Sequence, residues 1–451
     1  MSQCALNLKR PFSMRIPGFI DRRTILRGKR LWLHYGVFWI GAVATGLIAV
    51  MYARLIDFGY DAFLRASTRY WWLPLLLTPA IGALSVWLTR RFFPGSEGSG
   101  IPQVIATLHD KRDLGPRLLT LRILVGKIFV SFLSILGGFT IGREGPTIHV
   151  GAALMYSLRR FYPARLRSIR GGALERKLAL AGAAAGLSAA FNAPLAGVVF
   201  AIEELTRSFE ARTSGVLITA IIFAGIVSLA LQGNYVYFGT IDLVGSHFPD
   251  SLALAVILVG AITGVAGGIF CWLLLNTQRW MPARVLSWRE AHPVAFGAAC
   301  GLVIAVIGLA SRGHTFGSGY AEAREMLEAH SDVGVSYPLL KMASMVGSYL
   351  PGAPGGLFAP SLAIGAGIGN ALHLIFGGAH LPLPMLIALG MVGYLAAVTQ
   401  SPITAFVIVI EMINGHALVL SLMATALISS QVSRLFAPPL YEALARKYMS
   451  K

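Results

Sequence analysis

Charged residues are scarce in this sequence. They make up 13% of its 451 residues, against about 25% in a typical soluble domain, and the mean hydropathy is +0.67. Asp, Glu, Lys and Arg are absent from three long runs, 213–241, 251–278 and 342–410. One membrane span takes about 20 apolar residues, so the longest run must hold several segments. The sequence therefore predicts a multi-span membrane protein.

Acidic residues are the scarcer charge, with 20 Asp and Glu against 38 Lys and Arg. The excess is uneven, because eight basic residues and one acid, Asp21, precede the first expected span near Leu31. These basic residues are Lys9, Arg10, Arg15, Arg22, Arg23, Arg27, Lys29 and Arg30. Basic clusters beside spans mark the cytoplasmic side and attract anionic lipid. We therefore interpret 1–30 as a basic cytoplasmic segment of a cell (inner) membrane protein, and we expect no nucleic-acid partner.

Cysteine and metal-binding patterns are also scarce. Only Cys4, Cys271 and Cys300 are present, too few for a disulfide framework or a metal site. The sequence contains neither HExxH nor GxSxG, and its ten His are scattered. We expect no metal, no cofactor and no enzyme activity, although an intramembrane enzyme remains a distant alternative.

The most informative feature that is present is an internal repeat. Its landmarks are Gly98-Ser99-Gly100 with Gly317-Ser318-Gly319, Lys127 with Lys341, Gly142 with Gly356, Pro146 with Pro360, Gly151 with Gly365, Pro194 with Pro402, and Glu203 with Glu411. All of them occur in the same order, and most keep the same spacing. Duplicated halves, often inverted in the membrane, are typical of secondary transporters.

The expected fold is an all-α membrane protein in two inverted repeats, with about 15–18 tilted and partial helices. We place the transmembrane domain at 31–451, with a first repeat at about 31–210 and a second at about 215–435. The uncharged runs from Lys127 to Arg143 and from Glu144 to Arg159 are too short to span the bilayer. They predict half-helices that meet inside the membrane, where irregular backbone is tolerated only against protein or a wet cavity.

Three Gly/Pro motifs predict helix starts at that depth. They are Gly98-Ser99-Gly100-Ile101-Pro102, Gly142-Arg143-Glu144-Gly145-Pro146 and Gly355-Gly356-Leu357-Phe358-Ala359-Pro360. Glycine allows close backbone approach, and proline fits the first helical turn. A helix start offers unpaired amides and a positive dipole end. Three starts that converge would hold a dehydrated anion weakly enough to release it.

Together with a Tyr in PPLYEAL at 438–444, these motifs resemble the CLC chloride channels and transporters. The segment AAGLSAAFNAPLAG at 184–197, followed by Glu203-Glu204, is similar to bacterial chloride/proton exchangers. The resemblance covers about residue 31 to the end. It implies a homodimer with one independent pathway per subunit. Many eukaryotic relatives carry a cytosolic nucleotide-sensing pair of domains, and we expect no such regulatory domain in this sequence.

The resemblance also implies which residues bind the anion. They are the Ser99 and Tyr441 hydroxyls and the backbone amides of Leu357 and Phe358, with amides from Arg143 to Gly145 at an outer position. Serine at position 99 goes with chloride preference in the family. Lys127 either raises the local positive potential or caps a helix end, and the sequence leaves these two roles open.

Two acids are candidates for the proton path. An ionised Glu144 at a helix start would imitate the anion and block its site, and protonation would release it. The resemblance assigns this gate to Glu144, against a purely structural pair with Arg143. Glu204 matches the internal proton-transfer residue of the exchangers, whereas Glu203 is interpreted as structural. Chloride/proton antiport is thus the leading hypothesis, and a passive chloride channel with the same pore is the alternative.

Overall fold

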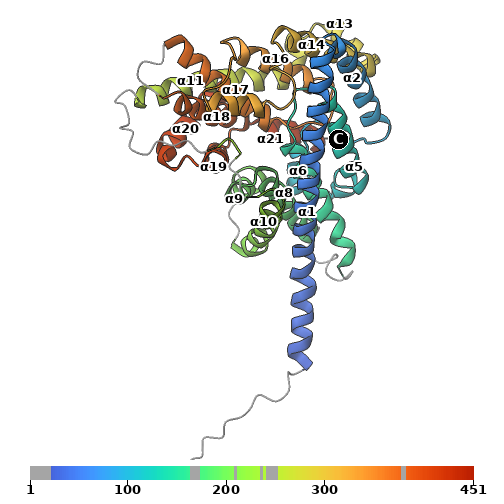
Figure 1. Cartoon of the computed structure of the whole chain (residues 1–451). Coiled ribbons are helices and arrows are strands. Elements are labelled where there is room, and N and C mark those ends of the chain that lie inside the picture. Colours follow the sequence, from blue (N-terminus) through green and yellow to red (C-terminus); the bar gives the residue numbers. More distant parts are fainter. Residues whose placement is uncertain are drawn as a thin grey trace, which may run out of the picture.

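A computed structural model of the whole chain describes residues 22–162, 173–207, 211–233, 237–239, 252–376 and 382–450. Its helices form a broad bundle from which the N-terminal end of α1 projects (Figure 1). In the described ranges the regular elements are all helices, and the β contacts are two isolated bridges. The expected all-α fold class is confirmed.

The first half contains α1 (Arg22–Arg69), α2 (Leu73–Arg91), α3 (Ile101–His109), α4 (Gly115–Leu118), α5 (Leu121–Leu136), α6 (Glu144–Ser157), η1 (Leu158–Phe161), α8 (Ala173–Phe191), α9 (Pro194–Phe200), η2 (Ala201–Thr206) and α10 (Ala211–Gln232). The basic segment expected at 1–30 lies largely outside the described residues. Helix α1 begins at Arg22, earlier than the start expected near Leu31.

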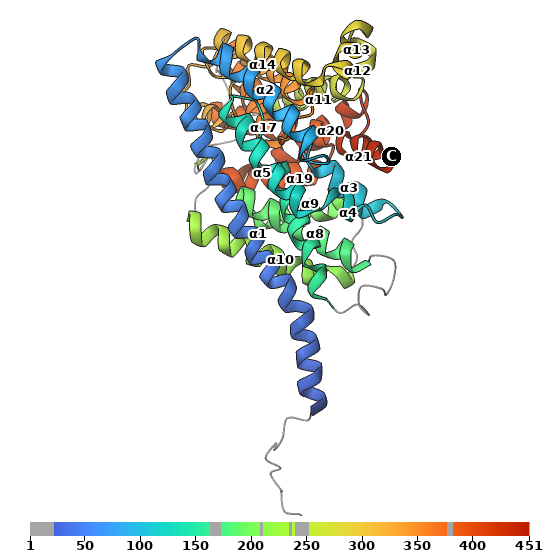
Figure 2. The ribbon, with the colours of Figure 1, turned by 90° about the vertical axis from the view of Figure 1, so that its right-hand side faces the viewer.

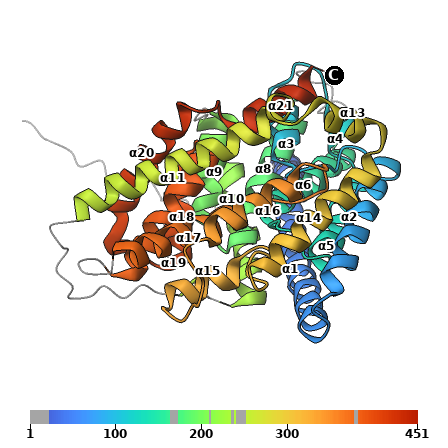
Figure 3. The ribbon, with the colours of Figure 1, turned by 90° about the horizontal axis from the view of Figure 1, so that it is seen from above.

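The second half contains α11 (Leu252–Leu275), α12 (Thr277–Trp280), α13 (Ala283–Ala291), α14 (Pro293–Ala310), α15 (Tyr320–Leu327), α16 (Tyr337–Tyr349), α17 (Phe358–Phe376), α18 (Leu383–Thr399), α19 (Pro402–Ile413), η3 (His416–Leu418), α20 (Val419–Arg434) and α21 (Leu440–Met449). Viewed from above, α11, α18 and α20 lie on one side of the molecule and α2, α5 and α14 on the other (Figure 3).

Within the described residues, six segments are long and apolar enough to cross a membrane. They are Gly36–Arg69, Leu73–Arg91, Gly115–Leu136, Leu252–Leu275, Pro293–Ala310 and Phe358–Ile375. Helix α6 has 14 residues and is about 21 Å long, shorter than the bilayer core of about 30 Å. It is therefore a partial helix, as the sequence predicted.

The start of the half-helix expected after Lys127 is wrong. Helix α5 begins at Leu121 and has 16 residues, so it is also shorter than the bilayer core, although it forms with α4 an apolar segment, Gly115–Leu136, that is long enough to span. The prediction failed because it took Lys127 as a helix boundary, whereas this lysine is buried in the middle of α5.

The repeat is visible in the order of the helices. Helices α2, α3, α5, α6, α8, α9 and α10 correspond in order to α14, α15, α16, α17, α18, α19 and α20. Equivalent glycines make equivalent contacts: Gly151 packs against Gly182 between α6 and α8, and Gly365 packs against Gly390 between α17 and α18. The close approach of these backbones leaves no room for a side chain. In Figure 2 the short helices α9 and α19 lie near the middle of the bundle.

Candidate anion and proton site

The loops that precede α3, α6 and α17 are joined by backbone hydrogen bonds. The Gly142 and Gly356 amides each donate to the carbonyl of the other at 2.8 Å, and the Gly355 amide donates to the Gly98 carbonyl at 3.1 Å. The three chain breaks that the sequence identified therefore meet at one place. Their first-turn amides, which have no acceptor within a helix, gather there as well.

Glycine is required where these loops touch. Gly100 has a φ of 97°, a left-handed conformation that side chains rarely adopt. A Cβ on Gly145 would lie 2.4 Å from the Ser99 Oγ atom. Only the missing side chain lets the start of α6 reach the serine that precedes α3.

Ser99 lies beside the start of α6, and the Tyr441 ring packs on the start of α17. Both residues are fully buried, and neither hydroxyl has a hydrogen-bond partner among the described residues. Phe358, the first residue of α17, stacks on the Tyr441 ring with centroids 6.1 Å apart. Because buried polar atoms are normally paired, the two hydroxyls fit a ligand that accepts hydrogen bonds, such as a dehydrated anion. Leu357 immediately precedes α17, so its amide lies at the N-terminal, positive end of that helix dipole.

The Glu144 carboxylate occupies the N-terminus of α17. It is fully buried, its Oε2 accepts from the Ala359 amide at 3.4 Å, and its Oε1 accepts from the Tyr320 hydroxyl at 2.6 Å. A carboxylate at this position uses the amides that an anion would use. The sequence did not predict the partner Tyr320, which lies 176 residues away.

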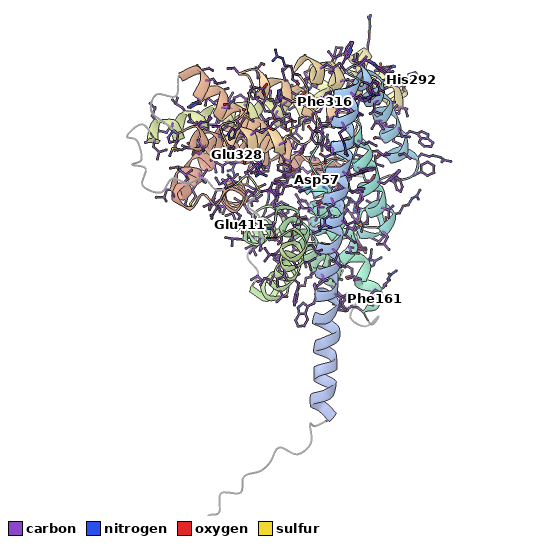
Figure 4. All side chains as sticks on the ribbon, in the orientation of Figure 1. Asp57, Phe161, His292, Phe316, Glu328 and Glu411 are labelled. Carbon is purple, nitrogen blue, oxygen red and sulfur yellow. The ribbon has the colours of Figure 1, made fainter. Side chains whose placement is uncertain are left out.

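Arg143 turns away from its neighbour toward α1. Its Nη1 donates to both Asp57 carboxylate oxygens, at 2.9 and 3.0 Å, whereas its Nε lies 4.0 Å from Glu144. The guanidinium also lies over the rings of Tyr237 and Tyr320, 5.5 and 5.9 Å from their centroids. Figure 4 marks Asp57 partway along α1. Among the described residues, the acid closest to Arg143 is thus Asp57 and not Glu144.

Lys127 is buried behind the Ser99 loop. Its Nζ donates to the carbonyls of Gly98 at 2.9 Å and Glu97 at 3.4 Å. Lys341 donates in the same way to the carbonyls of Phe316 and Gly317, at 3.0 and 3.1 Å. Each lysine therefore donates to carbonyls at the start of its own Gly-Ser-Gly turn, and Lys127 places its amino group against the loop that carries Ser99.

Glu204 is buried in η2, a six-residue π-helical turn. Its Oε2 accepts a hydrogen bond from the Ser401 hydroxyl. Ser401 also lines a cavity of about 620 Å³ together with Glu203 and Arg207. Ser401, which the sequence analysis missed, connects the buried acid to this cavity.

A second cavity, of about 710 Å³, is lined by Ser99 and by three cationic side chains, Arg90, Arg289 and Lys447, with Glu97 as its acid. None of these four charged residues was singled out in the sequence. The two cavities share no lining residue. One borders the Ser99 loop, and the other borders Ser401, whose hydroxyl donates a hydrogen bond to Glu204.

Glu203 and Glu411 cap helices in the opposite repeat. Glu203 accepts from the Ile403 and Thr404 amides at 3.1 and 2.6 Å, and Glu411 accepts from the Leu195 and Ala196 amides at 3.2 and 2.7 Å. Figure 4 labels Glu411 near the place where α19 meets α9. These contacts support the interpretation of Glu203 as structural.

A family model described as voltage gated chloride channel matches residues 81–434. The chain belongs to this family, the CLC proteins. The H(+)/Cl(-) exchange transporter ClcA of Salmonella arizonae is 28% identical, covering 96% of this chain and 92% of its own. ClcA of Citrobacter koseri is 29% identical, covering 91% and 88%.

Solved CLC structures have the same fold. A slow cyanobacterial Cl-/H+ antiporter matches with a TM-score of 0.78 and 26% identity, over 93% of this chain and 98% of that one. A CLC-type fluoride/proton antiporter matches with a TM-score of 0.75 and 20% identity, over 92% and 98%. The resemblance inferred from the motifs is thus confirmed, and the chain is a multi-pass membrane protein of a transporter family.

Proposed function

We propose that this protein exchanges chloride for protons across the cell membrane, with Glu144 as the gate. The observation that carries the proposal is the buried Glu144 carboxylate at the N-terminus of α17, hydrogen-bonded to the Ala359 amide. An ionised carboxylate there excludes an anion from the same amides. Protonation removes its charge, so a proton and an anion compete for one position. This competition is the minimum requirement for coupling their movements.

Chloride binds next to the gate in this proposal. The hydroxyls of Ser99 and Tyr441 donate to it, together with the amides of Leu357 and Phe358. The amides near Arg143 and Gly145 serve the outer position that Glu144 leaves. The buried and otherwise unpaired state of both hydroxyls supports this assignment, as does the cationic Lys127 behind the Ser99 loop. Neutral donors and dipoles bind an anion without the tight grip of a direct arginine contact.

Glu204 takes up the internal proton. It is buried, as intramembrane acids with functional roles usually are, and its hydrogen bond to Ser401 links it to a cavity separate from the one at Ser99. Protons therefore reach Glu204 through one cavity and chloride reaches Ser99 through the other. The two paths meet at Glu144.

Chloride is the proposed anion because the ClcA relatives are named as chloride exchangers and because position 99 is a serine. The proposed assembly is a homodimer with one pathway per subunit in the inner membrane. The N-terminus lies in the cytoplasm, which the basic residues of 1–30 support. Membrane lipid surrounds the assembly, and no nucleic acid takes part.

The experiment that tests exchange is reconstitution into sealed liposomes, with chloride and proton electrodes read together. We expect an outward chloride gradient to drive protons into the liposomes against their own gradient. Chloride flux without uphill proton movement would show a passive channel instead. Absence of any anion flux from folded protein would reopen the possibility of an intramembrane enzyme.

A further inference from the structure

One hydrogen bond at the gate joins the two repeats. Tyr320, the first residue of α15 in the second repeat, donates its hydroxyl proton to the Oε1 atom of Glu144 in the first repeat at 2.6 Å. The Ala359 amide donates to the other carboxylate oxygen, Oε2, at the longer distance of 3.4 Å. Of these two donors, Tyr320 lies closer to the gate carboxylate.

The Tyr320 ring is fixed by its neighbours. It contacts the rings of Tyr237 and Phe238, with centroids 4.6 and 5.6 Å away. The Arg143 guanidinium lies over both tyrosine rings and is anchored by Asp57. Because packing already holds the ring in place, the Tyr320 hydroxyl loses little conformational entropy when it binds the carboxylate.

The other groups that face the carboxylate are already engaged. On the residue before α6, Arg143 has Asp57 as its close partner and lies 4.0 Å from Glu144. On α1, the Tyr52 hydroxyl is hydrogen-bonded to Ser131 of α5. On α17, the Ala359 amide makes its contact with the Oε2 atom. The hydrogen bond from Tyr320 to Oε1 can therefore be removed by one conservative substitution, on a helix other than the one that carries Glu144.

We propose that Tyr320 is a positioning residue that latches the gate. Its hydroxyl stabilises the ionised carboxylate in the blocking position. It thereby sets the proton concentration at which the pathway opens and the chloride concentration needed to displace the carboxylate. The proposal rests on the gate role of Glu144 proposed above.

The direction of the expected pH shift follows from which protonation state of Glu144 the hydrogen bond stabilises. The Tyr320 hydroxyl donates to the oxygens of the ionised carboxylate, so the bond opposes protonation. A hydrogen bond to a charged group is among the stronger ones in proteins. Without it the carboxylate takes up a proton at a lower proton concentration, which means at a higher pH. It also yields its position to chloride more readily.

The first test is Tyr320→Phe, which keeps the ring and its contacts. We expect the midpoint of the pH profile of chloride flux to move upward by about one to two pH units. At a fixed pH above the midpoint, calorimetric titration with chloride should show binding about tenfold tighter or more. The matched control is Tyr394→Phe on α18, because the Tyr394 hydroxyl is buried and has no hydrogen-bond partner in the described part of the chain. It should follow the wild type in both measurements.

A second test, in the Glu144→Ala background, distinguishes the proposed role of Tyr320 from the proposed gate role of Glu144. In Glu144→Ala, adding Tyr320→Phe should change neither the pH profile nor the chloride affinity, because the carboxylate that the hydroxyl holds is gone. If Glu144→Ala uncouples protons but Tyr320→Phe alone retains the wild-type midpoint and affinity, the latch is wrong and the gate stands. If Glu144→Ala keeps proton coupling, the proposed gate fails first. A shift of equal size in both backgrounds would mean that Tyr320 acts through another group, which also overturns the latch.

Discussion

The roles proposed for the side chains at the gate depend on their surroundings. In our proposal Glu144 acts as an anion substitute because it lies at the N-terminus of a helix from the other repeat. The Ser99 and Tyr441 hydroxyls are proposed to donate to the anion because they are buried and have no protein partner in the described residues. At this scale, we expect single substitutions to affect chloride flux and proton flux differently.

Replacing the gate carboxylate should uncouple the ions. In Glu144→Ala we expect chloride flux to persist, while proton movement and the pH dependence of the flux are lost, because no group is left to exchange a proton for the anion position. Paired chloride and proton electrodes on liposomes measure this. The control is Glu328→Gln, which changes an exposed acid that pairs with Arg324. It should behave as the wild type. Continued uphill proton transport in Glu144→Ala would exclude the gate role.

Replacing the internal acid should stop protons alone. In Glu204→Gln the amide keeps the size of the side chain but cannot carry a proton, so we expect proton flux to fall to background while chloride still passes. Glu290→Gln, at an exposed acid on α13, serves as the control. If both fluxes disappear together in a correctly folded protein, Glu204 is not a proton relay.

At the scale of helices, the two repeats hold each other by crossed caps. Glu203 of the first repeat caps α19, and Glu411 of the second caps α9. A carboxylate at a helix start satisfies amides that have no acceptor within the helix, and it interacts favourably with the dipole. These two glutamates therefore belong to the fold, although Glu203 is adjacent in sequence to the proposed proton acceptor.

Removing either cap should lower stability without changing coupling. For Glu203→Ala and Glu411→Ala we expect each free energy of unfolding to fall by about 1 kcal/mol, because two helix amides lose their acceptor in each case. Denaturation in detergent measures the loss, and the chloride-to-proton ratio should stay at the wild-type value. A changed ratio in Glu411→Ala would give this capping residue a transport role.

At the scale of the molecule, a cavity with three cationic side chains borders Ser99, a residue of the proposed anion site. Arg90, Arg289 and Lys447 line it against one acid, Glu97. Charge of one sign within a cleft raises the local concentration of the opposite ion, and salt screens this effect. The cavity should therefore speed the arrival of chloride without binding it tightly.

Neutralising one of these cations should slow chloride in a salt-dependent way. For Arg289→Gln we expect several-fold slower chloride uptake at low ionic strength. The difference from the wild type should shrink as an inert salt such as isethionate is added. Arg284→Gln lies on the same helix, α13, at an exposed position that does not line the cavity, and it should show no such effect. A salt-independent loss in Arg289→Gln would indicate a structural role.

Much of the site was recognisable in the sequence because it depends on local backbone chemistry. The three Gly/Pro helix starts and the repeat of Lys127 in Lys341 were all visible as spacings along the chain. The errors came from treating a charge as a helix boundary, since Lys127 lies within α5 and its charge is satisfied by loop carbonyls.

The sequence by itself determined that this is an all-α membrane protein of the CLC family, and its repeated motifs suggested the anion and proton residues proposed above. Only the tertiary structure decided which groups touch the two acids, namely Tyr320 at Glu144 and Ser401 at Glu204. It also decided that Arg143 is anchored by Asp57 and that separate cavities border the two paths. The physical reason is that these contacts join residues 86 to 197 positions apart. Helical spacing specifies which residues share a face, but it does not specify which distant face lies against it.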